Sequence, residues 1–159
     1  MAVSDPHAIF VRRILGWGVA APLIEAGDIG RDLVLVPRPG SGRLDLGCVE
    51  GALNLGQDLA MALTMGRGTD PFDLDFGFDG LAALVEEQAP ALVRELLRAS
   101  VAKTVARDPR VRSVTAIEID DGSGGATRTL NLRVGVDTIA SDTASLVTTL
   151  ASSVLPMSP

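Results

Sequence analysis

The sequence predicts an α/β (α+β) fold in which helices pack on a small, mainly antiparallel sheet within one compact domain. Three observations support this fold class: runs with helical spacing in the middle of the chain, two later segments with alternating apolar residues, and a length of 159 residues. That length is typical of a single domain with its own core. Aromatic residues make up only 3% of the chain, so the core is expected to consist of Leu, Val, Ala and Ile.

The charge and the cysteine content exclude several classes of protein. A formal net charge of −6 argues against attachment to nucleic acid or to an anionic membrane surface. The single cysteine, Cys48, cannot form an intrachain disulfide, which indicates synthesis in a reducing compartment. No run approaches the roughly 18 apolar residues of a membrane span, and the N-terminus lacks a signal-like pattern. We therefore expect a cytoplasmic protein without membrane insertion.

The N-terminal third predicts a short element followed by a hairpin. Residues 1–15 are expected to form an arm or a short helix, because Ile9 to Leu15 is apolar and weakly amphipathic. The main domain, residues 16–137, begins at the Gly-Trp-Gly sequence that interrupts this element. Two apolar or alternating runs, 33–36 and 44–49, flank a turn rich in Pro, Gly and Ser, and this pattern predicts a β-hairpin.

Helices are expected in the middle of the chain. The run from Asn54 to Met65 has apolar residues at helical spacing, with Asn54 as N-cap and Gly66 as the stop. A second run covers Leu81 to Glu87 and is broken by Pro90, which suits the first turn of a new helix. That helix is expected over 91–106, with one apolar face made of Leu92, Val93, Leu96, Leu97, Val101 and Val105.

Two strands and a tail are expected after the last helix. The strand over 111–120 carries apolar residues at both parities, as in a strand covered on two sides. The strand over 129–137 alternates cleanly, with Leu130, Leu132, Val134 and Val136 inward, and should pair with the first in a hairpin. We expect this strand, or the tail after it, to leave a free edge. The tail, 138–159, fits either a further strand or a helix.

The sequence offers no evident catalytic or cofactor-binding set, so neither a cofactor nor a metal is expected. His7 is the only histidine and cannot serve a Ser–His or Cys–His pair from a terminus. The acidic segment at 70–79 lacks the closing Glu of a calcium loop. A glycoside hydrolase would need a carboxylate pair, for which Glu86, Glu87 and Asp75 are the candidates, but their spacing does not predict one.

The sequence Asp108-Pro109-Arg110 marks a corner where the long helix must end and a strand begins. The planar guanidinium of an arginine held after a proline suits bidentate recognition of a carboxylate. The alternative is an ordinary exposed arginine at a corner.

An ordered set of motifs resembles one known family. It consists of the Trp17–Leu23 segment, Gly30, the helix ending at 62–68, Pro71, Phe76-Gly77, Gly80-Leu81, the long helix, the 108–111 corner and the hairpin. Together, over residues 16–137, they are similar to the "lysozyme-like" tail baseplate wedge proteins of contractile phages and to related components of type VI secretion and other contractile injection systems. The family's Glu-Pro-Arg motif has Asp108 here in place of Glu. Of the family's Leu-Thr-x-x-Gly-x-Arg pattern, Leu63, Thr64 and Gly66 remain, but Gly68-Thr69-Asp70 follows where the final arginine is expected.

The resemblance implies a structural protein and no enzyme. It implies contacts with other baseplate wedge proteins, with the hub or inner tube and with the first sheath ring, six copies per particle, and initiation of sheath assembly. The candidate partner-binding residues are those of the corner and of the second strand: Asp108, Pro109, Arg110, Leu130, Leu132, Arg133, Val134 and Asp137. The alternatives are a peptidoglycan-cleaving glycosidase carried in the particle and an unrelated adaptor that uses the same strand edges.

Overall fold

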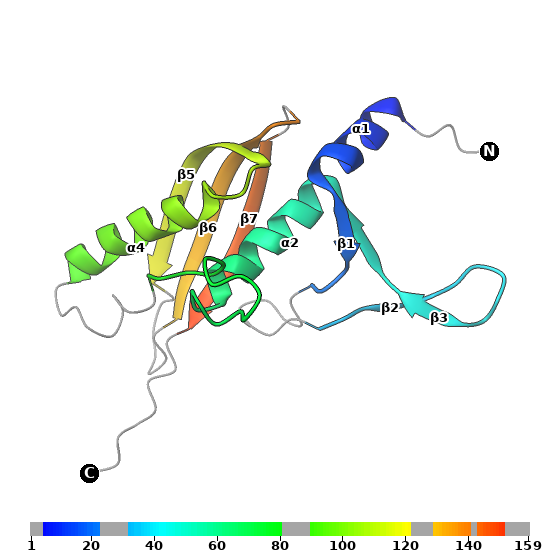
Figure 1. Cartoon of the computed structure of the whole chain (residues 1–159), viewed down its shortest axis with the longest axis horizontal. Coiled ribbons are helices and arrows are strands. Elements are labelled where there is room, and N and C mark those ends of the chain that lie inside the picture. The colour runs from blue at the N-terminus through cyan, green and yellow to red at the C-terminus, as the bar shows by residue number, and fades with distance from the viewer. Residues whose placement is uncertain (1–4, 23–31, 81–89, 122–128, 141–142, 152–159) are drawn as a thin grey trace, which may run out of the picture.

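The computed structural model describes residues 5–22, 32–80, 90–121, 129–140 and 143–151 (Figure 1). The helix and carboxylates expected at 81–87 and the turn after Asp121 therefore lie outside the described residues. Helices pack on small antiparallel sheets, which confirms the predicted fold class. The elements are α1 (Pro6–Leu15), β1 (Trp17–Val19), β2 (Leu35–Pro37), β3 (Leu44–Leu46), β4 (Cys48–Glu50), α2 (Gly51–Thr64), α4 (Pro90–Val105), β5 (Val111–Asp121), β6 (Thr129–Thr138) and β7 (Thr143–Ala151).

The main body of the protein is the antiparallel sheet β5-β6-β7 with helices α2 and α4 packed on it (Figure 1). The two helices and the sheet share one apolar core. The buried side chains of this core include Leu55, Leu59 and Leu63 of α2, Leu97, Val101 and Val105 of α4, and Leu132, Val134 and Val136 of β6. On the opposite face of the sheet, Arg133 and Glu118 are exposed and form an ion pair at 3.3 Å. Within the described residues, the helices thus cover one face of the sheet.

Strand β5 corrects the expectation that it would be covered on two sides. Its pairing with β6 shifts register twice, between Val111 and Ser113 and again between Val114 and Ala116. Each irregularity adds a residue and reverses the alternation. As a result Val111, Val114, Ile117 and Ile119 all pack against the same core. Because the strand is bulged, apolar residues at odd and at even sequence positions lie on the same face of the sheet.

Strand β6 is the central strand of the sheet, so of the two expected locations of a free edge, this strand and the tail after it, the structure excludes the first. It pairs with β5 along one side and with β7 along the other. The uncertain tail contributes β7, and the sheet order therefore places β7 at an edge. Gly135 lies in β6 where a Cβ atom would come within 2.7 Å of the Thr115 hydroxyl, so this glycine permits the close approach of the bulged β5.

Two further two-stranded pairs, β1 with β4 and β2 with β3, precede α2 in the chain. Strands β3 and β4 form one nearly continuous strand interrupted only by Gly47, while β2 and β1 pair with its two halves. Gly47 donates to the Val34 carbonyl at 2.7 Å and accepts from the Ala20 N–H at 2.8 Å, and Val34 donates to the Ala20 carbonyl at 3.2 Å. The strand opposite β3–β4 is therefore split, and the chain leaves it after Ala20 and rejoins it at Val34. We call this unit the split ribbon; it contains the predicted hairpin, β2–β3.

Two local expectations about the helices are wrong. Asn54 is not an N-cap but a buried residue within α2, which begins at Gly51. In α4, which does begin at Pro90, Leu97, Val101 and Val105 are buried as expected, whereas Leu92 and Leu96 are exposed. The buried stripe follows positions 97, 101 and 105, and Leu96 lies about 100° around the helix from Leu97.

Candidate functional site

The Asp-Pro-Arg corner is built by a turn that the Asp108 side chain closes. Helix α4 ends at Val105, and Asp108 Oδ1 accepts the backbone N–H of Arg110 at 2.9 Å. This is the local bond of an Asx turn, for which Asp is well suited because its side chain is short. Pro109 lies inside the turn, where its missing N–H is not needed, and β5 starts at Val111.

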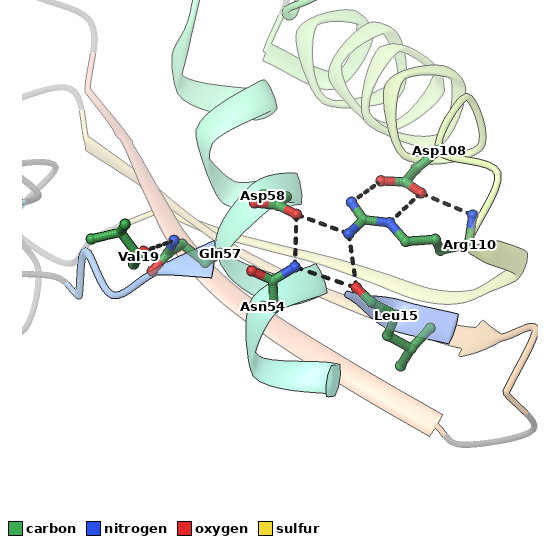
Figure 2. A network of polar contacts seen from close by, with 7 residues as sticks. All are labelled: Leu15, Val19, Asn54, Gln57, Asp58, Asp108 and Arg110. Carbon is green, nitrogen blue, oxygen red and sulfur yellow. Dashed lines mark hydrogen bonds and ion pairs between the residues drawn. The ribbon is translucent and has the colours of Figure 1, made fainter. Parts of the chain in front are cut away.

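Arg110 is turned into the protein and is held from three sides (Figure 2). Its Nε and Nη2 donate to the two Asp108 carboxylate oxygens at 2.9 and 2.6 Å, in the bidentate arrangement that guanidinium favours. Its Nη1 donates to Asp58 Oδ2 at 2.9 Å and to the Leu15 carbonyl at 3.0 Å. The corner is therefore tied to α2 and to the end of α1.

The electrostatics of the corner favour the charged pair. Burial by itself raises the pKa of the Asp108 carboxyl, but hydrogen bonds and the charge of Arg110 outweigh it, so the pKa is lowered. Hydrogen bonding to Asp108 raises the pKa of Arg110 further above its ordinary value. The guanidinium also meets a carbonyl at the C-terminus of α1, where a cation is favoured by the helix dipole.

Three polar residues of α2 complete this network, and the sequence analysis did not predict their part in it. Asn54 Nδ2 donates to the Leu15 carbonyl at 3.3 Å and to Asp58 Oδ2 at 3.2 Å. Gln57 donates to the Val19 carbonyl at 2.9 Å and accepts from the Ala21 N–H at 2.8 Å. The spacing of residues 54, 57 and 58 could have indicated the network, because it places three polar side chains on one side of an otherwise apolar helix.

A cavity of about 460 Å³ lies beside this network. Its walls come from α2, from the loop at 73–77 and from the corner at the end of α4. Leu59, Met61, Ala62, Phe76 and Pro109 give an apolar lining, and Asp58, Asp73 and Asp75 add carboxylates. Arg107 and Arg110 line it as well, so the carboxylates of the cavity stand beside guanidinium groups of the same chain.

Two of the four aspartates of the acidic segment, Asp75 and Asp79, are paired with basic side chains of the same chain. Asp75 accepts a hydrogen bond from Arg67, and this bond lowers the pKa of the Asp75 carboxyl. Asp79 accepts from Ser100 and Lys103, and the Ser100 hydrogen bond makes the largest contribution to lowering its pKa. A general acid would need a raised pKa instead. No group of three or more His, Cys, Asp or Glu side chains suited to a metal occurs among the residues that the structure describes.

The structure divides the predicted partner-binding residues into two sets. Asp108, Pro109 and Arg110 lie together beside the cavity. Leu132 and Val134 are buried in the core, whereas Arg133 lies on the outer face and Asp137 accepts a bond from Ser113. Leu130 lies in β6, opposite Leu150 of β7. The two sets approach each other where Ile139 N–H donates to the Arg110 carbonyl at 3.0 Å, just beyond β6.

Comparison with known proteins adds no family to this description. The chain matches none of the protein-family models and none of the curated proteins with which it was compared. Within the described part of the chain, no helix combines the length and apolar character needed to cross a bilayer.

Proposed function

We propose that this chain is a structural baseplate component of a contractile phage tail-like injection system, present in the cytoplasm until it is built into a particle. In this role it links wedge and hub or tube proteins to the first sheath ring and initiates sheath assembly, in six copies per particle. The proposal rests on the ordered motifs of residues 16–137 and on the contact surfaces that the fold exposes.

The observation that carries the proposal is the position of β7 at an edge of the main sheet. Among the described strands, β7 pairs only with β6, so its other backbone edge has no strand beside it. An exposed edge accepts a strand from another chain through main-chain hydrogen bonds without a special side chain. A strand from a sheath subunit would extend the sheet there.

Neighbouring proline substitutions test this edge. Thr148 and Thr149 lie opposite Leu132 and Asn131, and successive residues direct their N–H groups to opposite edges of a strand. Thr148→Pro and Thr149→Pro should therefore differ: one removes a bond to β6 and destabilises the fold, and the other removes only an outward donor. The variant that folds should fail to start sheath when it is produced with the sheath and tube proteins. Valine at the same position, which keeps the N–H, is the control. Sheath of normal length from the folded proline variant would exclude β7 as the initiating edge.

The cavity beside Arg110 is the proposed contact with another wedge protein. Because Arg110 also supports the fold, its substitution cannot separate the two roles. Met61 lines the cavity and is exposed on α2, and Leu53 is exposed on α2 away from the cavity. Met61→Glu should prevent incorporation into baseplates without unfolding the chain, whereas Leu53→Glu should not. Equal incorporation of both variants would exclude the cavity as the contact.

The alternative function, peptidoglycan cleavage, receives no support from the described carboxylates. Asp75, the described candidate, has a lowered pKa, which is the wrong direction for the acid of a glycosidase. We predict that the purified protein leaves the turbidity of a peptidoglycan suspension unchanged between about pH 4 and 8. Clearing that is lost on Asp75→Asn or Glu86→Gln substitution would overturn the structural role.

A further inference from the structure

The split ribbon presents apolar side chains that nothing in the described structure covers. Residues opposite each other in an antiparallel pair lie on the same face. Leu35 is paired with Leu46, and Pro37 with Leu44, so these residues form one face of the β2–β3 hairpin. Leu35 is 58% and Leu44 63% exposed. Clustered leucines on a projecting hairpin differ from the scattered apolar residues of an ordinary surface and mark a contact site.

The charges around this face differ from those of the chain as a whole. The turn at 37–43 carries Arg38 and Arg43 and no acidic residue, in a protein whose net charge is −6. The Arg38 N–H donates to the Arg43 carbonyl at 2.8 Å, which keeps both residues at the same end of the hairpin. Neither guanidinium has an ion pair within the described residues. The face therefore suits an apolar surface that carries carboxylates.

The acidic loop at 70–75 has that composition. Phe72 is 98% exposed and Leu74 is 69% exposed, in a chain with only four phenylalanines. Residues 67–79 contain four aspartates and one arginine. The loop conformation is fixed by hydrogen bonds from backbone N–H groups to the Asp70 and Asp73 carboxylates, which holds Phe72 and Leu74 outward. This second exposed element complements the hairpin in both charge and apolar character.

The hairpin and the loop of one molecule cannot meet each other. The split ribbon runs beside α2 as far as Gln57, which bonds to Val19 and Ala21, and the hairpin continues beyond that point. The loop follows the C-terminus of α2. Figure 1 shows the hairpin projecting away from the main body, whereas the loop lies against the main body at the C-terminal end of α2. Any contact between the two elements is therefore a contact between copies.

We infer that a second copy of this chain binds the hairpin: Phe72 and Leu74 of one molecule pack against Leu35, Leu44 and Leu46 of the next, with Asp70 facing Arg38 or Arg43. The two surfaces are different, so a single hairpin–loop contact is heterologous and leaves one hairpin and one loop free; two reciprocal contacts would instead close a two-fold dimer. Repetition closes a ring or extends a filament. The inference deepens the proposed function, because six copies around a tube could close such a ring, but the contact is testable with the purified chain alone.

The test uses two variants that each disable one surface. Leu44→Ser damages the hairpin face and Phe72→Ser damages the loop, and both side chains are exposed, so neither change removes a core contact. In sedimentation velocity the unmodified chain should grow in mass with concentration. Each variant alone should remain a monomer, with the dissociation constant raised about tenfold or more, as for a central aromatic or apolar contact. An equimolar mixture should form a one-to-one complex and nothing larger, since each pair then lacks a second working surface.

Matched controls give the outcomes that would overturn the inference. Val36→Ser alters the opposite face of the same hairpin, where Val36 pairs with Asp45, and should associate like the unmodified chain. Arg38→Glu combined with Arg43→Glu should weaken association, and Asp120→Lys on the outer sheet face should not. A monomeric unmodified chain at every concentration refutes the contact, whether or not the protein initiates sheath. Continued association of Phe72→Ser would show that the hairpin binds another hairpin instead, and equal effects of Val36→Ser and Leu44→Ser would refute the assigned face.

Discussion

Leucine side chains are buried in the main body but exposed in the split ribbon. In the body, Leu55 of α2, Leu97 of α4 and Leu132 of β6 are all buried in one core. In the ribbon, the leucines of the β2–β3 hairpin are exposed although they lie on a regular strand pair. The difference is one of layers: the body has helices on its sheet, whereas the described structure places no second layer on the hairpin (Figure 1).

This contrast separates residues that specify the monomer from residues available for assembly. A two-stranded hairpin alone is marginally stable in water, whereas a sheet with a helix-covered apolar face can be stable independently. The stability of the isolated chain should therefore depend on the body and be nearly indifferent to the ribbon leucines. The following predictions test how sharp that division is.

The largest effect is expected in the core. Leu55→Ala removes a fully buried side chain from α2 and should reduce the free energy of unfolding by about 2–5 kcal/mol. Chemical denaturation of the purified chain measures this. The matched change in the ribbon is Leu35→Ala, which should have little effect. Equal losses for the two variants would mean that the ribbon belongs to the same cooperative unit as the core.

The second largest effect on the free energy of unfolding is expected for the hydrogen-bond network of the Asp108–Arg110 corner. Arg110→Ala leaves the Asp108 and Asp58 carboxylates without their cation, and since the site is only partly buried we expect a loss of about 2 kcal/mol, less than for a fully buried pair. Arg110→Lys should restore part of it, because lysine keeps the charge but not the fork. The exposed pair of Arg98 with Glu95 is the control, and Arg98→Ala should change stability by about 0.5 kcal/mol or less. A corner variant as stable as the control would show that the network does not support the fold.

The same corner should respond to acid. The pKa of Asp108 is lowered below its ordinary value of 3.8, so the folded state binds fewer protons there than the unfolded chain. The stabilisation is thus complete above pH 3.8 and is lost as the pH falls through the lowered folded-state pKa. Asp108→Asn keeps the turn-closing oxygen and removes the charge. The difference in unfolding free energy between the unmodified chain and this variant should shrink from pH 7 to about pH 3; a constant difference would contradict the assignment.

The smallest effect is expected in the hairpin. Leu35→Ser together with Leu46→Ser should change the unfolding free energy of the monomer by about 0.5 kcal/mol or less, as for surface substitutions away from packed contacts. Thermal or denaturant unfolding at low protein concentration measures it. A loss comparable to that of Leu55→Ala would contradict the separation of ribbon and body.

Helix ends and turns that are set by proline or glycine could be predicted from the sequence. Pro90 begins α4, Gly66 follows the end of α2, and the Pro/Gly turn joins β2 to β3, because these residues restrict the backbone locally. The face of β5 could not be predicted, since its two irregularities depend on the pairing with β6. The central position of β6 depended on the tail, whose sequence fitted a strand and a helix equally.

In the candidate site, too, contacts between residues far apart in the sequence could not be predicted. The sequence indicated that Arg110 suits bidentate recognition of a carboxylate, with an ordinary exposed arginine as the alternative, and in the structure this carboxylate is Asp108 of the same chain. The other acceptors are Asp58, which is far away in sequence, and the backbone carbonyl of Leu15. A carbonyl is present at every residue, so no side-chain pattern identifies the one that a tertiary contact selects. The contact of this corner with a wedge protein stays a prediction.

The bond between Arg110 and the Leu15 carbonyl also bears on the order of folding. It joins positions 95 residues apart, and such distant contacts form slowly because a long loop must close first. During synthesis, α1 and β1 leave the ribosome well before the corner that secures them. Of the two donors to the Leu15 carbonyl, Asn54 of α2 emerges first and Arg110 much later. Until then the side chain of Leu15, fully buried in the finished protein, is only partly enclosed and is open to chaperones and proteases. The N-terminal segment is thus expected to become fully fixed only when the corner has formed.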